Sequence, residues 1–103
     1  MTRLPVEDLP DLLASMPLWK HGIERGGTIT REFLFGDFAE AFAFMAHVAI
    51  LAEKRDHHPE WSNVYNRVNV TLTTHDVAGL SMNDVDLARA MDAIAAARNI
   101  PLE

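Results

Sequence analysis

Residues 28–55 read TITREFLFGDFAEAFAFMAHVAILAEKR, a strand pattern followed directly by a helix pattern. In the strand part, Ile29, Phe33 and Phe35 share one parity, and the alternate positions from Thr28 to Glu32 are polar. Side chains on a strand point to opposite faces in turn, so this alternation predicts a strand with one buried face.

Asp37 is expected to cap the helix that follows, because Glu40 stands at the spacing of a capping box. The helix should end near Arg55, since Pro59 disfavours helical geometry at His58. Apolar residues recur along it at three- and four-residue steps, which predicts an apolar stripe facing the core. The stripe consists of Phe38, Ala41, Phe42, Met45, Val48, Ala49 and Ala52.

Two further elements precede this unit. Residues 5–16 carry leucines at helical spacing and predict a short N-terminal helix. Residues 18–24 and 28–35 are separated by Arg25-Gly26-Gly27, a glycine-rich turn that predicts a hairpin of two strands.

Residues 60–75 alternate like a strand, and one long strand or a hairpin fits them. We favour a hairpin turning at Asn66-Arg67, because a sixteen-residue strand greatly exceeds the usual length. Ser81 should begin a last helix that ends at Pro101, with an apolar stripe of Val85, Ala88, Met91 and Ala95. The order α-β-β-α-β-β-α predicts an α+β fold in which helices cover one face of an antiparallel sheet.

Length and charge limit the classes of function. The chain has 103 residues, which suits a single domain over residues 1–103. Nine Lys and Arg against fifteen Asp and Glu give a net charge of −6, so direct binding to nucleic acid or to an anionic membrane is not expected. There is no cysteine and no apolar run of the ~18 residues that a membrane span needs. We therefore expect a cytoplasmic protein without thiol chemistry.

The most informative stretch for function is residues 53–61, EKRDHHPEW. It places His57 and His58 where a helix should end and a strand begin, and His75 and Asp84 follow further along the chain. Imidazole moves protons well near neutral pH because its unperturbed pKa is about 6.5. Three imidazoles with nearby carboxylates therefore predict proton-transfer chemistry.

Local spacing predicts different environments for the two adjacent histidines. If the helix persists to residue 57, Glu53 shares a face with His57 and can accept a hydrogen bond from it. His58 lies just beyond, with Pro59 stiffening the backbone behind it. Adjacent side chains of extended chain point to opposite sides, so His57 and His58 should do different work.

Other interpretations of the same residues remain open. A histidine pair at a helix end can simply suit the helix dipole, and Asp84 can complete a capping box with Ser81. Two histidines and a carboxylate could also hold iron or zinc, but neighbouring histidines rarely aim at one ion. We rank a metal site below proton transfer. His21 and His47 are expected to be surface residues.

The pattern of these residues resembles the signature of the pterin-4a-carbinolamine dehydratases. The similarity extends over residues 5–98 and is loose only before residue 28. It rests on Glu53-x3-His57-His58-Pro59-x5-Tyr65-x9-His75-x8-Asp84, supported by Phe38-x3-Phe42-x-Phe44-Met45 and Leu72-x-Thr74-His75-x3-Gly79-Leu80-Ser81.

The resemblance implies a four-stranded antiparallel sheet with three helices on one face, assembled as a homotetramer or dimer. It implies dehydration of 4a-hydroxytetrahydropterin to quinonoid dihydropterin, which recycles the cofactor of aromatic amino-acid hydroxylases, without a metal or organic cofactor. Animal members also bind a transcription factor's dimerisation helix as coactivators. An interaction module with little catalysis is therefore the alternative.

Carried over residue by residue, the resemblance makes His57, His58 and His75 the active-site histidines, with Glu53 and Asp84 as the acids that support them. We predict that His57 and His75 form the acid–base pair, and that His58 orients the reduced pterin. Pro59 and Trp61 are further candidates for substrate contact, although Trp61 fits a packing role equally well.

Overall fold

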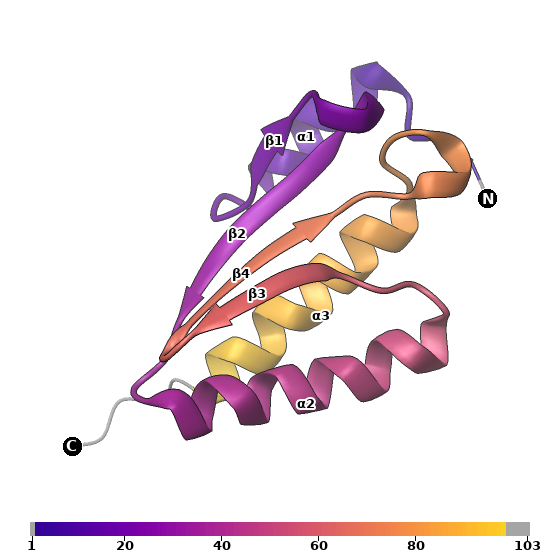
Figure 1. Ribbon diagram of the computed structural model, residues 1–103. Helices are drawn as coiled ribbons and strands as arrows, with labels where there is room; N and C mark the ends of the chain where they lie inside the picture. Colours follow the sequence, from indigo (N-terminus) through magenta and orange to yellow (C-terminus); the bar gives the residue numbers. More distant parts are fainter. Residues whose placement is uncertain (1, 99–103) are drawn as a thin grey trace.

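The computed structural model describes residues 2–98 and has the predicted order of elements (Figure 1). Three short 3-10 turns, η1 to η3, accompany the helices and strands. The elements are η1 Val6–Asp8, α1 Leu9–Ala14, β1 Lys20–Gly22, η2 Glu24–Gly26, β2 Thr28–Leu34, α2 Phe38–Arg55, β3 Glu60–Val64, β4 Arg67–Leu72, η3 His75–Val77 and α3 Met82–Arg98.

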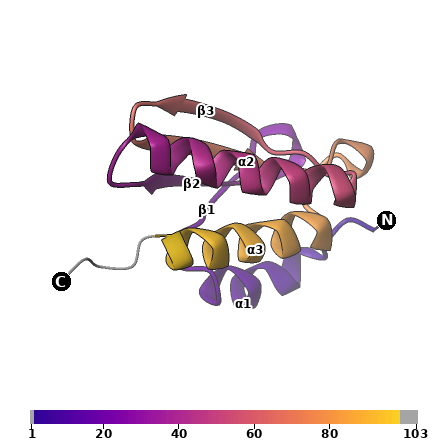
Figure 2. The same cartoon turned by 90° about the horizontal axis from the view of Figure 1, so that it is seen from below.

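The four strands form one antiparallel sheet in the order β1-β2-β4-β3. The central pair, β2 and β4, aligns Ile29 with Leu72 and Phe33 with Val68, and all four side chains are buried. The helices lie on one side of the sheet (Figure 2). The predicted α+β architecture is confirmed. The helices lie on one face because the alternating residues of the strands make only that face of the sheet apolar.

The buried face of α2 differs from the predicted stripe. Phe44 is fully buried, and its ring centroid lies 4.8 Å from that of Phe33. Phe38 and Phe42 are instead 50% and 57% exposed, so their assignment to the core was wrong, as was that of Ala49. A helix with apolar residues at so many positions has two possible stripes, and the packing against β2 selects the one that contains Phe44.

The first hairpin is shorter than predicted. Strand β1 spans only Lys20–Gly22 of the expected strand 18–24, and the turn η2 already begins at Glu24. Arg25 lies in the left-handed region at φ 52°. Gly26 approaches the loop after β4 so closely that a Cβ on Gly26 would lie 1.9 Å from the carbonyl oxygen of Ala78. The glycine therefore allows the turn to pack against the segment after β4.

The second hairpin is confirmed, but it turns one residue earlier than predicted. Val64 pairs with Arg67, so the turn is Tyr65-Asn66, with Tyr65 at φ 50°. The Asn63 amide donates to the carbonyl oxygens of Tyr65 and Arg67 at 3.0 and 2.8 Å. A side chain just before the turn thus stabilises it, and this was missed when only the turn residues were considered.

Helix α3 buries all four residues of its predicted stripe and also Leu87. Asp92 ties the helix to the rest of the fold, because it accepts hydrogen bonds from the indole of Trp19 and from Arg31. The predicted helix end at Pro101 lies outside the described residues. Within residues 2–98, no helix combines the length and the apolar character that crossing a bilayer requires.

Candidate active site

A hollow of about 590 Å³ lies where α2 gives way to β3 and where β4 leads into η3. The structure brings His57, His58 and His75 to this one hollow, although the last two are 17 positions apart in sequence. Its volume is in the range of small-molecule sites. Its lining consists of Arg25, Asp56, His57, His58, Glu60, Thr73, Thr74, His75, Asp76 and Ala78.

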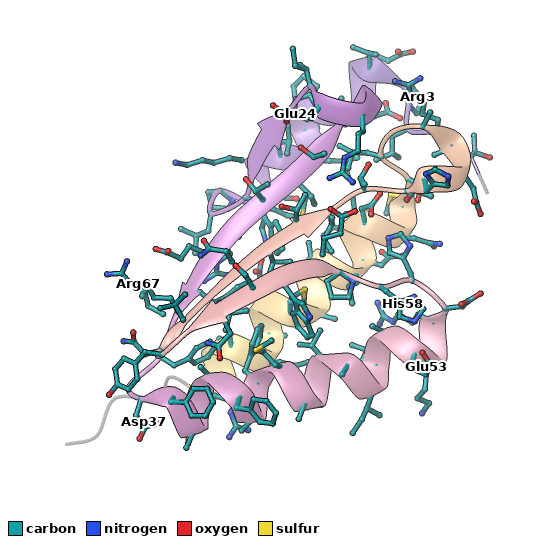
Figure 3. The ribbon with its side chains drawn as sticks, viewed as in Figure 1. Arg3, Glu24, Asp37, Glu53, His58 and Arg67 are labelled. Carbon is teal, nitrogen blue, oxygen red and sulfur yellow. The ribbon has the colours of Figure 1, made fainter. Side chains whose placement is uncertain are left out.

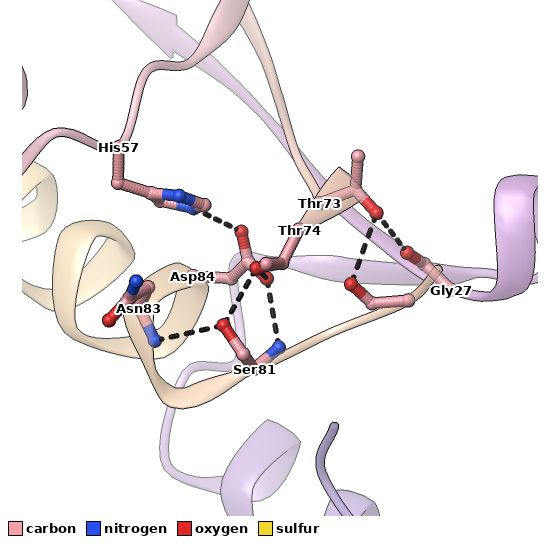
Figure 4. Close-up of polar contacts among 8 residues, drawn as sticks. Gly27, His57, Thr73, Thr74, Ser81, Asn83 and Asp84 are labelled. Carbon is pink, nitrogen blue, oxygen red and sulfur yellow. Dashed lines mark hydrogen bonds and ion pairs between the residues drawn. The ribbon is translucent and has the colours of Figure 1, made fainter. Parts of the chain in front are cut away.

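His57 is turned inward by the end of α2. The helix ends at Arg55, and Asp56 adopts the left-handed conformation of a C-cap at φ 50°. The imidazole of His57 is consequently buried, with only 9% of the residue's surface exposed. Its Nε2 lies 2.6 Å from Oδ1 of Asp84 (Figure 4). The predicted contact between His57 and Glu53 was therefore wrong, because the helix stops two residues before His57.

Glu53 supports the other histidine. Its Oε1 lies 2.9 Å from Nε2 of His58, and both side chains are exposed at the end of α2 (Figure 3). His57 and His58 thus have different partners and different exposure. This agrees with the prediction that the two adjacent side chains point to opposite sides.

Asp84 is completely buried at the start of α3. Its Oδ2 accepts a hydrogen bond from the backbone N–H of Ser81 at 3.0 Å and another from Oγ1 of Thr74 at 2.6 Å. The first of these is the contact expected of a capping box. Asp84 therefore combines two interpretations that the sequence left as alternatives, because one carboxylate oxygen caps the helix and the other contacts His57.

His75 lies in the 3-10 turn η3 and not on the strand where it was predicted. Strand β4 ends at Leu72, and a backbone bridge between Thr74 and Gly79 closes the loop. The exposed imidazole then lines the same hollow as the residues that follow α2. The loop thus brings the third histidine to the site. Periodicity alone could not distinguish this loop from a longer strand.

Arg25 and Glu60 form part of the lining that sequence reasoning missed. The guanidinium donates from its two terminal nitrogens to the two carboxylate oxygens, at 2.6 and 2.9 Å. No spacing rule joins a residue of a glycine-rich turn to the first residue of a distant strand. The pair forms because the sheet register places the start of β2, which follows η2, and the start of β3 at the same end of the sheet: Thr30 and Glu60 both pair with Thr71 of β4.

Arg25→Ala is expected to raise the pKa of Glu60 toward its ordinary value, because the hydrogen bond from Arg25 lowers that pKa in the folded protein. Because the pKa of Glu60 is lower in the folded protein than in the unfolded chain, the pair stabilises the fold at pH values above the unfolded pKa. That stabilisation is lost as the pH falls through the folded pKa. The measurement is an NMR titration of the Glu60 carboxylate. Arg67→Ala, at the opposite end of the sheet, should leave the titration unchanged, and an unchanged pKa in Arg25→Ala would contradict the pairing.

The two predicted substrate-contact residues lie outside the lining of the hollow. Trp61 pairs with Val70 in the sheet and packs, half-buried, against the hydrophobic core. Pro59 connects His58 to β3. A packing role for Trp61 agrees with this position, and contact of Trp61 or Pro59 with a ligand stays a prediction.

The site offers acid–base groups in distinct environments. One imidazole is buried against a carboxylate, one is exposed beside a carboxylate, and one is exposed on a loop. Within residues 2–98, no three His, Asp or Glu side chains are placed to hold a metal ion together. Several imidazoles around one hollow can take a proton from one atom of a bound molecule and give a proton to another.

Comparisons with known proteins agree on one family. The family model for pterin 4 alpha carbinolamine dehydratase matches residues 2–94. A protein of Rhodopseudomonas palustris (strain BisB18) that is named for this activity is 56% identical over 94 residues, or 91% of this chain and 92% of its own.

Solved structures agree. A transcriptional coactivator/pterin dehydratase from Brucella melitensis has a TM-score of 0.85 and 48% identity, covering 91% of this chain and 99% of its own. A pterin dehydratase-like protein identified as a RuBisCO assembly factor in the alpha-carboxysome has a TM-score of 0.66 and 27% identity, covering 75% of this chain and 88% of its own. The chain belongs to the pterin-4a-carbinolamine dehydratase family of hydro-lyases.

Proposed function

We propose that the protein removes water from 4a-hydroxytetrahydropterin by histidine acid–base catalysis and so serves tetrahydropterin recycling. One histidine gives a proton to the 4a-hydroxyl, the C4a–O bond breaks, and water leaves. A second histidine takes the proton of the neighbouring ring nitrogen, and the freed electron pair forms the C4a=N bond of the quinonoid product. Solvent then returns both histidines to their starting protonation states.

His57 and His75 are the proposed acid–base pair, since they line one hollow from different segments, the end of α2 and the turn η3. His58 would orient the pterin from the rim, steadied by Glu53, while Asp84 would hold His57. The gathering of three imidazoles around one hollow is the observation that carries the proposal. The proposed reaction uses only protons, and the residues above supply and accept them.

The direct test is to mix the purified protein with 4a-hydroxytetrahydropterin, generated enzymatically, and to follow formation of the quinonoid product by absorbance. The assay is run with and without a strong chelator. Dehydration well above the spontaneous rate in both arms supports the proposal. Activity that disappears with the chelator and returns with added zinc or iron would replace it with a metal mechanism.

We also propose that the protein forms a homo-oligomer through an apolar patch on α2 and the end of the sheet. Phe38 and Phe42 are in ring contact at 5.9 Å on the first turns of α2. Figure 1 puts the start of α2 beside the β3–β4 turn, where Val64 and Tyr65 are 68% and 62% exposed. Patches of this kind mark interaction sites on soluble proteins.

Phe42→Glu is expected to convert the oligomer to an 11.5 kDa monomer in size-exclusion chromatography with light scattering. A charge buried without a partner in an apolar interface disfavours association. His47→Glu adds the same charge to another exposed side of α2 and should leave the assembly intact. A wild-type protein that is already monomeric, or a Phe42→Glu variant that keeps its mass, would contradict the assignment.

A second candidate function is that of an interaction module with little catalysis. Two relatives of known structure favour it, because one is described as a transcriptional coactivator and the other as an assembly factor. The same dehydration assay separates the two functions. A folded, oligomeric wild-type protein that does not accelerate dehydration would favour the interaction module.

A further inference from the structure

Two buried hydroxyl groups continue the hydrogen bonding of Asp84 away from His57 (Figure 4). Oγ1 of Thr74 lies 2.6 Å from Oδ2 of Asp84 and 2.7 Å from Oγ of Ser81. The backbone N–H of Asn83 in turn donates to Oγ of Ser81 at 3.3 Å. These hydrogen bonds form a chain that connects the N–H of Asn83 through two hydroxyls to the carboxylate of Asp84.

The backbone holds both hydroxyl-bearing residues in place. The N–H of Thr74 donates to the carbonyl oxygen of Gly79 at 2.8 Å, and Ser81 forms a bridge with Arg3 near the N-terminus. Thr74 and Ser81 are 3% and 1% exposed. Their hydroxyls therefore exchange hydrogen bonds with each other and with Asp84 and not with bulk water.

Counting protons gives the chain a direction. A backbone N–H can only donate, so Oγ of Ser81 accepts from Asn83, and its own proton is available to Thr74. The single hydroxyl proton of Thr74 then goes to Oδ2 of Asp84, which also accepts from the N–H of Ser81. Two donors at Oδ2 stabilise the ionised carboxylate, so Oδ1 is an acceptor for Nε2–H of His57.

We propose that Thr74 and Ser81 are positioning residues that keep the proton of neutral His57 on Nε2 and leave Nδ1 free to accept a proton. This inference rests on the proposed dehydration and assigns His57 as its base, with His75 as the acid. Within residues 2–98, Nδ1 has no hydrogen-bond partner, and no unpaired side-chain nitrogen or oxygen is sealed from solvent. Nδ1 is therefore open to solvent, on a side chain that lines this hollow and a neighbouring one beside α3.

The first test is ¹⁵N NMR of His57 in the substrate-free protein at a pH where the ring is neutral. The inference expects a protonated Nε2 and a bare Nδ1. Thr74→Val keeps the shape of the side chain but removes the hydroxyl, so it should produce a mixture of tautomers. Thr74→Ser restores the hydroxyl and should restore the wild-type spectrum. Thr71→Val, the same substitution on the neighbouring strand β4, is the matched control.

The second readout is kinetic. Thr74→Val should lower kcat about tenfold, the effect expected from losing one hydrogen bond to a charged group, while KM changes little. Thr74→Ser should recover most of kcat. Equal losses in Thr74→Val and Thr74→Ser, or a His57 spectrum in Thr74→Val identical to wild type, would overturn the inference.

The wild-type spectrum alone is decisive even if Thr74→Val does not fold. A bare Nε2 and a protonated Nδ1 would overturn the proton assignment, whatever the activity of the protein. If the protein shows the expected tautomer but no dehydratase activity, the role of the hydrogen-bond chain stands and the proposed reaction is wrong. Failure of this inference is thus distinguishable from failure of the proposed function.

Discussion

His57→Ala and His75→Ala are each expected to lower kcat/KM for dehydration by roughly 10²–10⁴-fold, the usual contribution of a positioned general acid or base. The two imidazoles line one hollow, so both can reach a ligand bound there. His58→Ala should have a smaller effect, chiefly on KM, because its role is to orient the pterin. The measurement is steady-state dehydration of the 4a-hydroxypterin by each variant.

His47→Ala is the matched control, because this exposed histidine lies on α2 away from the hollow. It should keep wild-type kcat/KM. Circular dichroism spectra and thermal unfolding separate lost chemistry from lost structure. Wild-type activity in all three site variants would remove the site assignment, and an equal loss in His47→Ala would attribute the effect to the fold.

Asp84→Ala is expected to reduce both stability and activity. The substitution leaves the N–H of Ser81, the hydroxyl of Thr74 and the imidazole of His57 without their shared acceptor in a buried site. Each orphaned buried group costs about 1–3 kcal/mol, so we expect a loss of roughly 3 kcal/mol in the free energy of unfolding. For a domain of this size that corresponds to a fall in Tm of roughly 4–8 °C for each kcal/mol.

The control is Asp86→Ala, two residues later on α3, where the side chain is exposed. It changes the net charge equally and should shift Tm little. Denaturant unfolding at one fixed protein concentration is the measurement, because assembly adds to apparent stability. Equal losses in the two variants would mean that charge, and not the buried network, sets the stability.

Much of the fold follows from periodicity. The alternation around Phe33 and the capping residue Asp37 predicted β2 and the start of α2, and the stripe of α3 was confirmed. The errors occurred where a local pattern had two solutions. Phe42 and Phe44 are both apolar, and only packing against the rings of Phe33 and Phe35 decides which of them is buried.

The site was predictable as a set of residues but not as a set of contacts. The spacing of His57, His58 and His75 identified the imidazoles that meet at one hollow. The wrong pairing of Glu53 came from extending a helix that ends at Arg55. A one- or two-residue error at a helix end is ordinary, but here it decides which histidine a carboxylate supports.

The sequence by itself determined the order of elements, the buried face of β2 and the histidines available for proton transfer, because these depend on local spacing. Only the tertiary structure decided that Asp84 belongs to His57, that Arg25 reaches Glu60, and that Thr74 and Ser81 continue the hydrogen bonds of the carboxylate. Each of these contacts joins residues on different elements, and their meeting depends on how the helices and loops pack around the sheet.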